Sequence, residues 1–155
     1  IPKDKLMTQL KTATDLIDQQ YPFLFYFGEG SFQRTLDFAR TKLFERKNEY
    51  INDFILRRDS ENFIKKITSQ KTQMNEFLTV LYSWVRDAII LKTGIRREQL
   101  IHVDRSEDVS QFSQKYTFNE LKDLMDDVLN ASQGLLENLN IKIPLLIIKE
   151  KIRYG

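Results

Sequence analysis

His102 is the one histidine of this 155-residue chain, and Asp104 follows it two positions later. A hydrolase of the Ser-His-Asp type would have to use this pair, with the histidine as general base and the aspartate orienting it. The segment that holds them is expected to be an irregular link between helices, where a histidine commonly serves as a polar surface or capping residue. We therefore predict a structural role for His102. A single histidine also excludes a histidine-rich metal site.

Asp123 and Asp127 are the next candidates, with Asp126 beside them. Side chains four residues apart share one face of a helix, and paired carboxylates of this kind can bind a divalent cation or transfer protons. The sequence predicts no second acidic helix that would complete such a site. We interpret these aspartates as a solvated helix face.

Glycine and cysteine usage excludes two further kinds of chemistry. The five glycines do not form a phosphate-binding loop, because Gly28 and Gly30 are not followed by the lysine and the serine or threonine that such a loop requires. The chain has no cysteine, which excludes disulfides, thiolate nucleophiles and cysteine-zinc sites and fits a reducing, cytoplasmic location. The sequence therefore predicts no catalytic residue, no metal ligand and no cofactor.

The charges are evenly mixed along the chain. The net charge is +2 overall, and it is +2, +2 and −2 in residues 1–58, 59–105 and 106–155. Basic residues occur as doublets at positions 57–58, 65–66 and 96–97, which are too short for a nucleic-acid stripe. No apolar run approaches the ~20 residues that span a bilayer. Because the chain begins at Ile1, we expect it to be a piece of a longer protein.

The elements that would position these residues are predicted to be helices. Apolar residues recur at helical spacing, and no segment alternates as a strand does. We expect an all-α fold, a compact multi-helix bundle. Its helices are predicted over residues 3–20, 32–58, 72–93, 108–114 and 117–139, with a short helix after an N-cap at Asp59 or Ser60, an aromatic run over residues 21–27 and a last helix from about Pro144.

The helix over residues 72–93 has the widest apolar stripe, with Trp84 on it, and Gly94 is expected to end it. Thr117 and Glu120 form a predicted capping box at the start of the next long helix, in which Leu129 and Leu136 are expected to point inward. Residues 145–148 of the last helix are apolar on every side, so we expect this helix to be buried centrally. One small domain cannot cover all of this apolar surface, so an exposed patch is predicted at one edge.

Three stretches resemble the clamp-loader subunits of bacterial DNA polymerase III, which belong to the AAA+ superfamily. The sequence GSFQRTL at residues 30–36 is similar to the Gly-Ser-x-x-Arg-x-Leu segment of the lid domain. WVRDAIILK at residues 84–92, with LIHVD at 100–104, resembles an apolar Arg-Asp helix and the link after it in the collar domain of the delta-prime subunit. NLN at residues 138–140 resembles the turn before the final helix of that domain.

This resemblance implies a non-catalytic assembly domain of delta-prime type that packs with gamma/tau and delta subunits in a pentameric collar. It implies that residues 1–45 are the end of the lid region and residues 46–155 the collar, or oligomerisation, domain. DNA would be contacted only through the full complex, with no membrane partner and no small-molecule substrate. Arg34 occupies the position of a nucleotide-sensing arginine in related ATPase subunits and is a weak candidate for that role. The structural or interface candidates are Trp84, Arg86, Asp87, Leu145 and Ile148.

Two other interpretations stay open at this point. The chain could be the same domain from a gamma/tau or delta subunit, with a different place in the collar. It could also be a helical nucleic-acid-binding domain that uses the basic doublets, in which case its DNA affinity would fall steeply with salt.

Overall fold

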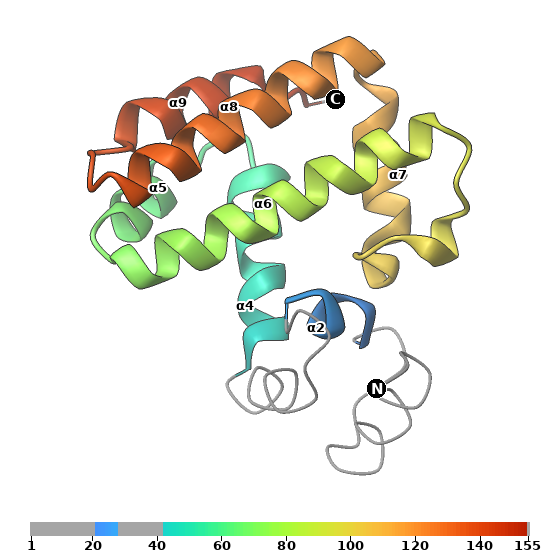
Figure 1. Cartoon of the computed structure of the whole chain (residues 1–155), viewed down its shortest axis with the longest axis horizontal. Helices are drawn as coiled ribbons and strands as arrows, with labels where there is room; N and C mark the ends of the chain where they lie inside the picture. Colours follow the sequence, from blue (N-terminus) through green and yellow to red (C-terminus); the bar gives the residue numbers. More distant parts are fainter. Residues whose placement is uncertain (1–20, 28–41, 155) are drawn as a thin grey trace.

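The computed structural model describes residues 21–27 and 42–154, and every regular element in these ranges is a helix. The all-α prediction is therefore confirmed. Two long helices, α6 (Lys71–Lys92) and α8 (Phe118–Leu136), run side by side, and α9 (Lys142–Lys151) returns along α8 (Figure 1). Helix α7 (Ser106–Gln114) packs on α6 and connects it to α8. Together α6, α8 and α9 form the frame of the bundle.

Shorter elements complete it. Helix α4 (Leu43–Tyr50) continues directly into the π-helical turn η2 (Ile51–Ile55), and α5 (Glu61–Thr68) packs on both α6 and α9. Two 3-10 turns, η3 (Arg97–Gln99) and η4 (Val103–Arg105), form the link between α6 and α7. Helix α2 (Tyr21–Phe27) lies against α4 (Figure 1). The predicted helix over residues 3–20, the first part of the one over 32–58 and the segment at residues 30–36 lie outside the described residues.

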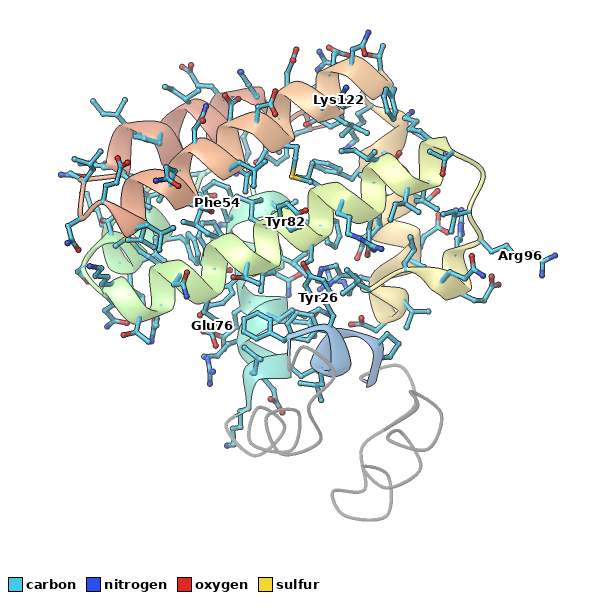
Figure 2. The ribbon with its side chains drawn as sticks, in the orientation of Figure 1. Tyr26, Phe54, Glu76, Tyr82, Arg96 and Lys122 are labelled. Carbon is cyan, nitrogen blue, oxygen red and sulfur yellow. The ribbon has the colours of Figure 1, made fainter. Side chains whose placement is uncertain are left out.

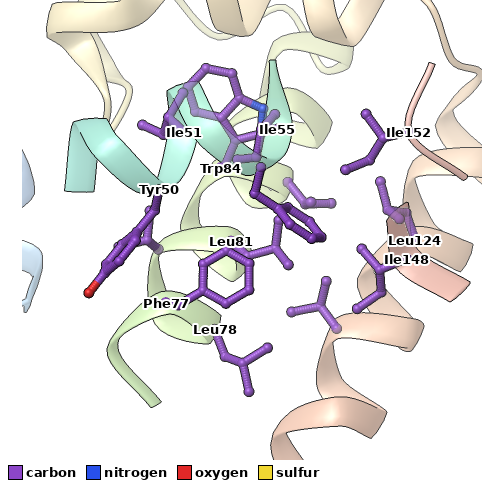
Figure 3. Packing of buried hydrophobic residues seen from close by; sticks show 14 of the residues in the cluster. Tyr50, Ile51, Ile55, Phe77, Leu78, Leu81, Trp84, Leu124, Ile148 and Ile152 are labelled. Atoms are coloured by element: carbon purple, nitrogen blue, oxygen red, sulfur yellow. The ribbon is translucent and has the colours of Figure 1, made fainter. Parts of the chain in front are cut away.

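The core is one continuous cluster between α6 and the helices around it. Helix α6 buries the stripe that its sequence predicts, and Trp84 is fully buried within it. Phe77 meets the rings of Tyr50, Phe54 and Phe63 at centroid distances of 5.7, 4.9 and 5.2 Å, all edge-on. This edge-to-face geometry is the one that aromatic quadrupoles favour. Figure 3 shows residues of α6 meeting residues from η2 and from the C-terminal helices in this cluster.

The structure contains the helix boundaries predicted at Gly94 and Thr117. The Thr117 hydroxyl accepts from the Glu120 N–H at 3.1 Å, and the Glu120 carboxylate accepts from the Thr117 N–H at 2.9 Å, so the capping box is confirmed. Gly94 follows the end of α6 with φ of +86°, a left-handed conformation that glycine adopts without a steric penalty. Both features are local, which explains why the sequence alone predicts them.

The start of α5 differs from a simple serine cap. Ser60 is the N-cap residue, but its hydroxyl donates back to the carbonyls of Asp53 and Arg57, at 2.7 and 3.2 Å. The ammonium of Lys149 and the hydroxyl of Tyr154 donate to the Arg57 carbonyl as well. Ser60 therefore stabilises the end of the preceding π-helical turn, while the Asp59 carboxylate accepts from the N–H of Glu61 at 3.2 Å.

Two predictions about the C-terminal helices are wrong. Leu129 and Leu136 do not point inward, because α8 buries only the faces toward α6 and α9 and these residues lie on its outer flank. Helix α9 is not buried centrally. Leu145 and Ile148 are fully buried, whereas Leu146 and Ile147 on its other face are exposed. The helix lies at the edge of the bundle, so that no second layer covers its outer side.

A buried polar cluster and a candidate subunit interface

Asp87 on α6 fixes the link between α6 and α7. Its carboxylate is fully buried and accepts from the backbone N–H groups of Ile101 and His102, at 3.1 and 2.8 Å. The guanidinium of Arg86 lies 3.2 Å from the same carboxylate. Burial raises the pKa of Asp87 to about 6, although the two N–H donors and Arg86 oppose that rise. The carboxylate satisfies two N–H groups that would otherwise be buried without a partner.

His102 is fully buried, so the expectation of a surface residue is wrong. The side chains around it are packing residues of the core. Its ring packs on Trp84 and Phe23 with centroids 5.6 and 5.5 Å away. Its Nε2 lies 2.7 Å from the hydroxyl of Ser83, which itself donates to the carbonyl of Val80 at 2.7 Å. If the single hydroxyl proton of Ser83 goes to Val80, a neutral His102 ring holds its hydrogen on Nε2 and donates to Ser83.

This arrangement differs from a catalytic serine-histidine pair. A general base activates a hydroxyl that a substrate can reach, but Ser83 and His102 are both fully buried. Burial, with the charges of Lys47, Arg105 and Arg86, holds the pKa of His102 well below its usual value. Asp104, the carboxylate nearest to it in sequence, pairs instead with Lys47. The histidine is thus a neutral packing residue.

Lys47 on α4 forms the second part of the cluster. Its ammonium lies 2.8 and 2.7 Å from the two carboxylate oxygens of Asp104, and the lysine is fully buried. The same ammonium lies 4.4 Å from the ring centroid of Phe44 and 5.3 Å from that of Phe23. Burial lowers the pKa of Lys47 to about 8, against the opposing charge of Asp104. This cluster joins α2, α4, α6 and the link before α7.

The sequence did not single out Lys47 or Ser83. A signal was nevertheless present, since Lys47 lies at helical spacing between two core residues, Leu43 and Tyr50. A charged residue on an otherwise apolar helix face requires a buried partner. That partner, Asp104, is 57 positions away along the chain, and only the fold brings the two together.

The candidates predicted from sequence occupy different places. Trp84, Asp87, Leu145 and Ile148 are fully buried, and Arg86 is partly exposed beside Asp87. Arg34 lies outside the described residues.

Asp127 pairs with Lys151 at 2.6 Å, and the described residues include no group of three or more acidic or histidine side chains that could hold a metal ion. None of the helices described here combines the length and apolar character needed to cross a membrane.

The hairpin formed by α8 and α9 carries most of the exposed apolar surface. Of the nine large hydrophobic residues found exposed in the described ranges, seven lie between positions 118 and 147. The most exposed are at the turn, where Leu136, Ile143 and Leu139 are 76%, 68% and 58% accessible. We call these three residues, together with Leu146 and Ile147, the hairpin face. Clustered exposed apolar residues of this kind mark interaction sites rather than ordinary surface.

Several basic residues of the described ranges have acidic partners. Arg46 pairs with Glu76 at 2.6 Å, and Arg97 pairs with Glu107 at 2.7 Å. Arg153 pairs with Glu120 and lowers the pKa of that carboxyl to about 2. Among the three basic doublets, Lys65 and Arg97 form ion pairs, with Glu61 and Glu107.

Comparison with known proteins identifies the family. The model of the family described as "DNA polymerase III, delta subunit, C terminal" matches residues 41–150, more than two thirds of the chain. No curated protein and no solved structure matches the chain significantly. The matched range contains every described helix except α2, including the buried polar cluster on α4 and α6 and the hairpin of α8 and α9. The chain belongs to the family of C-terminal domains of the DNA polymerase III delta subunit.

Proposed function

We propose that this chain is a non-catalytic assembly domain of a clamp loader, and that its hairpin face packs against the collar domains of neighbouring subunits. The observation that carries the proposal is the position of the exposed apolar residues on the α8–α9 hairpin, within the range that the family model matches. An isolated domain gains nothing from exposed leucine and isoleucine side chains, whereas each one buried by a partner contributes to association. Permanent interfaces are enriched in such residues.

The finer assignment is to a subunit of delta-prime type. It is supported by the resemblance of residues 84–92 and 100–104 to that collar domain. In this chain Asp87 of the first stretch binds the backbone of the second through the N–H groups of Ile101 and His102. We place the boundary between lid region and collar domain near residue 45, and gamma/tau and delta are the proposed partners.

The alternative of a nucleic-acid-binding domain is disfavoured by the even mixing of charges, which leaves a net charge of only +2 on the chain. Arg97 and Lys65 of the predicted basic set lie close to acidic side chains, Glu107 and Glu61. A phosphate-binding surface needs cations that are free to contact phosphates and displace the counterions of the nucleic acid, so its affinity falls steeply with salt. DNA contact is therefore proposed to occur only through the assembled complex.

Co-purification tests the proposal. This chain, expressed with the collar domains of gamma/tau and of delta from the same organism, should form a complex that survives gel filtration at micromolar concentration. A complex with either partner supports the assembly function. If both partners are folded and neither binds at tens of micromolar, the assembly function is wrong.

A further inference from the structure

A second surface lies on the other side of α9, where this helix faces α5. A groove of about 380 Å³ separates the two helices. Its apolar lining is formed by Ile64 of α5 and Leu146 of α9. Helices α5 and α9 appear next to each other at one end of the bundle (Figure 1). The volume falls in the range of pockets that hold small ligands or single side chains.

The charged residues around this groove are mostly cationic. Lys65, Lys142 and Lys149 line it, and Glu61 is the one acidic residue in the lining. Glu61 and Lys65 lie 3.5 Å apart and are both largely exposed, so their pairing is weak. The groove therefore combines an apolar floor with a net positive rim.

Two of these lysines have no carboxylate partner in the described part of the chain. No described acidic side chain lies within ion-pair distance of Lys142. The ammonium of Lys149 donates to the carbonyls of Phe54 and Arg57 and to the hydroxyl of Tyr154, which satisfies its hydrogen bonds without neutralising its charge. The charge of Asp59 acts on Lys149, but Asp59 does not line the groove.

We propose that the α5–α9 groove binds an acidic peptide segment of a partner protein. One large apolar side chain of the peptide would enter the groove and contact Ile64 and Leu146. Flanking aspartate or glutamate residues would pair with the ammonium groups of Lys65 and Lys142, because charge-assisted hydrogen bonds are stronger than neutral ones, and Lys149 adds positive charge beside them. This site shares only Leu146 with the hairpin face, and it does not require the collar interaction.

A fluorescence anisotropy titration on the chain alone tests the site. The probe is a labelled synthetic peptide of about ten residues, in which leucine and phenylalanine are flanked by aspartates. We expect saturable binding with a Kd in the range of about 1 to 100 μM that weakens as salt is added, because the rim is exposed to solvent. A second peptide with asparagine in place of every aspartate should bind at least about fivefold more weakly, a loss of about 1 kcal/mol.

Lys142→Glu is the diagnostic variant. It reverses one rim charge in the first turn of α9, where an acidic side chain favours the helix, so the fold should be retained. Lys122→Glu on α8 is the matched control, because it makes the same charge change on an exposed residue far from the groove lining (Figure 2). We expect at least a fivefold loss of affinity for Lys142→Glu, a loss of about 1 kcal/mol, and less than a twofold loss for Lys122→Glu.

Three results would overturn the proposal. They are the absence of saturable binding up to roughly 1 mM peptide, equal binding of the asparagine peptide, and equal losses in the two lysine variants. Leu146→Ser provides a second measurement, since it removes the apolar contact without altering charge and should also weaken binding. Because the collar subunits are absent from this titration, its failure would leave the assembly proposal untouched.

Discussion

The hydroxyl oxygen of Ser83 and the Nε2 of His102 lie 2.7 Å apart in the interior of the bundle, with neither side chain exposed to solvent. The hydroxyl oxygen of Ser83 also lies 2.7 Å from the Val80 carbonyl oxygen. The Nδ1 atom of His102 has no hydrogen-bond partner among the described groups. Protonation of this ring would place a positive charge in a fully buried position near Lys47, Arg105 and Arg86.

Acid is therefore expected to destabilise the domain through His102. In the folded state the pKa of His102 is held well below 6.5, whereas the unfolded chain has the ordinary value. Below about pH 6.5 the unfolded chain takes up a proton that the folded chain does not. The contribution of neutral His102 to the free energy of unfolding is therefore complete above this pH. It is lost as the pH falls, by at most about 1.4 kcal/mol per pH unit. Urea denaturation at several pH values should show this slope, and His102→Gln should remove it.

Protonation of Asp87 has the opposite effect on the free energy of unfolding, and it acts at lower pH. Its folded-state pKa of about 6 exceeds the ordinary value of 3.8, so the folded chain takes up this proton first and gains stability as the pH falls between these values. The Asp87→Asn variant should therefore make the acid-induced loss steeper below about pH 6. If His102→Gln and the unmodified chain have the same pH slope below pH 6.5, the assignment to His102 is wrong.

The pair of Lys47 and Asp104 should show strong coupling in a double-mutant cycle. Replacing Lys47 by methionine leaves a nearly buried carboxylate without its partner, and a loss of about 3 to 5 kcal/mol is expected. Replacing both residues, by methionine and leucine, should cost clearly less than the sum of the single changes, because no unpaired charge remains. Unfolding free energies of the four proteins measure the coupling, and additive losses would contradict it.

Local signals in the sequence predict part of this fold well. The stripe on α6, Gly94 after it and the Thr117 capping box depend on residues within a few turns of one helix, so periodicity and capping rules suffice. The error in α9 has a different cause. An apolar run looks the same whether a helix is covered on all sides or lies at the edge of a bundle, and only the arrangement of α5 and α8 exposes Ile143 and Ile147.

The buried polar cluster could be predicted only in part. Arg86 and Asp87 were predicted to be structural or interface residues, and Arg86 lies 3.2 Å from the Asp87 carboxylate. The backbone N–H groups bound by the same carboxylate belong to residues 14 and 15 positions later, so no local pattern reveals them. His102 was misplaced for the same reason, since α2 and α6, which bury its ring, are distant in sequence.

Trp84→Ala should cost about 3 to 5 kcal/mol, because it deletes the largest fully buried side chain from the centre of α6. The ring packs edge-on against Phe112 with centroids 6.0 Å apart, and the surrounding helices cannot collapse fully into the space. Urea denaturation gives the free energy of unfolding. Trp84→Phe is the matched control and should lose less, since it retains an aromatic ring in the same position.

Gly94→Ala should destabilise the domain by about 1 kcal/mol, because alanine is strained at φ of +86°. A Cβ at this position would meet no atom within 4 Å, so the cost comes from the backbone alone. Gly94→Asn tests this backbone cause, since asparagine tolerates left-handed conformations and should cost less than alanine. Equal thermal midpoints for all three proteins would show that this turn is not held in the left-handed conformation in solution.

The hairpin face should be required for assembly and dispensable for folding. Leu136 and Ile143 are its most exposed residues, so Leu136→Glu and Ile143→Glu should change the unfolding free energy by less than about 0.5 kcal/mol. In a complex each glutamate would be buried without a partner, at a cost of several kcal/mol, and co-purification with the collar domains of gamma/tau should be lost. Ile95→Glu is the matched control, since it makes the same change at an exposed isoleucine outside the hairpin and should leave assembly intact. If Ile95→Glu abolishes assembly while both hairpin variants retain it, the subunit interface lies on another face of the domain.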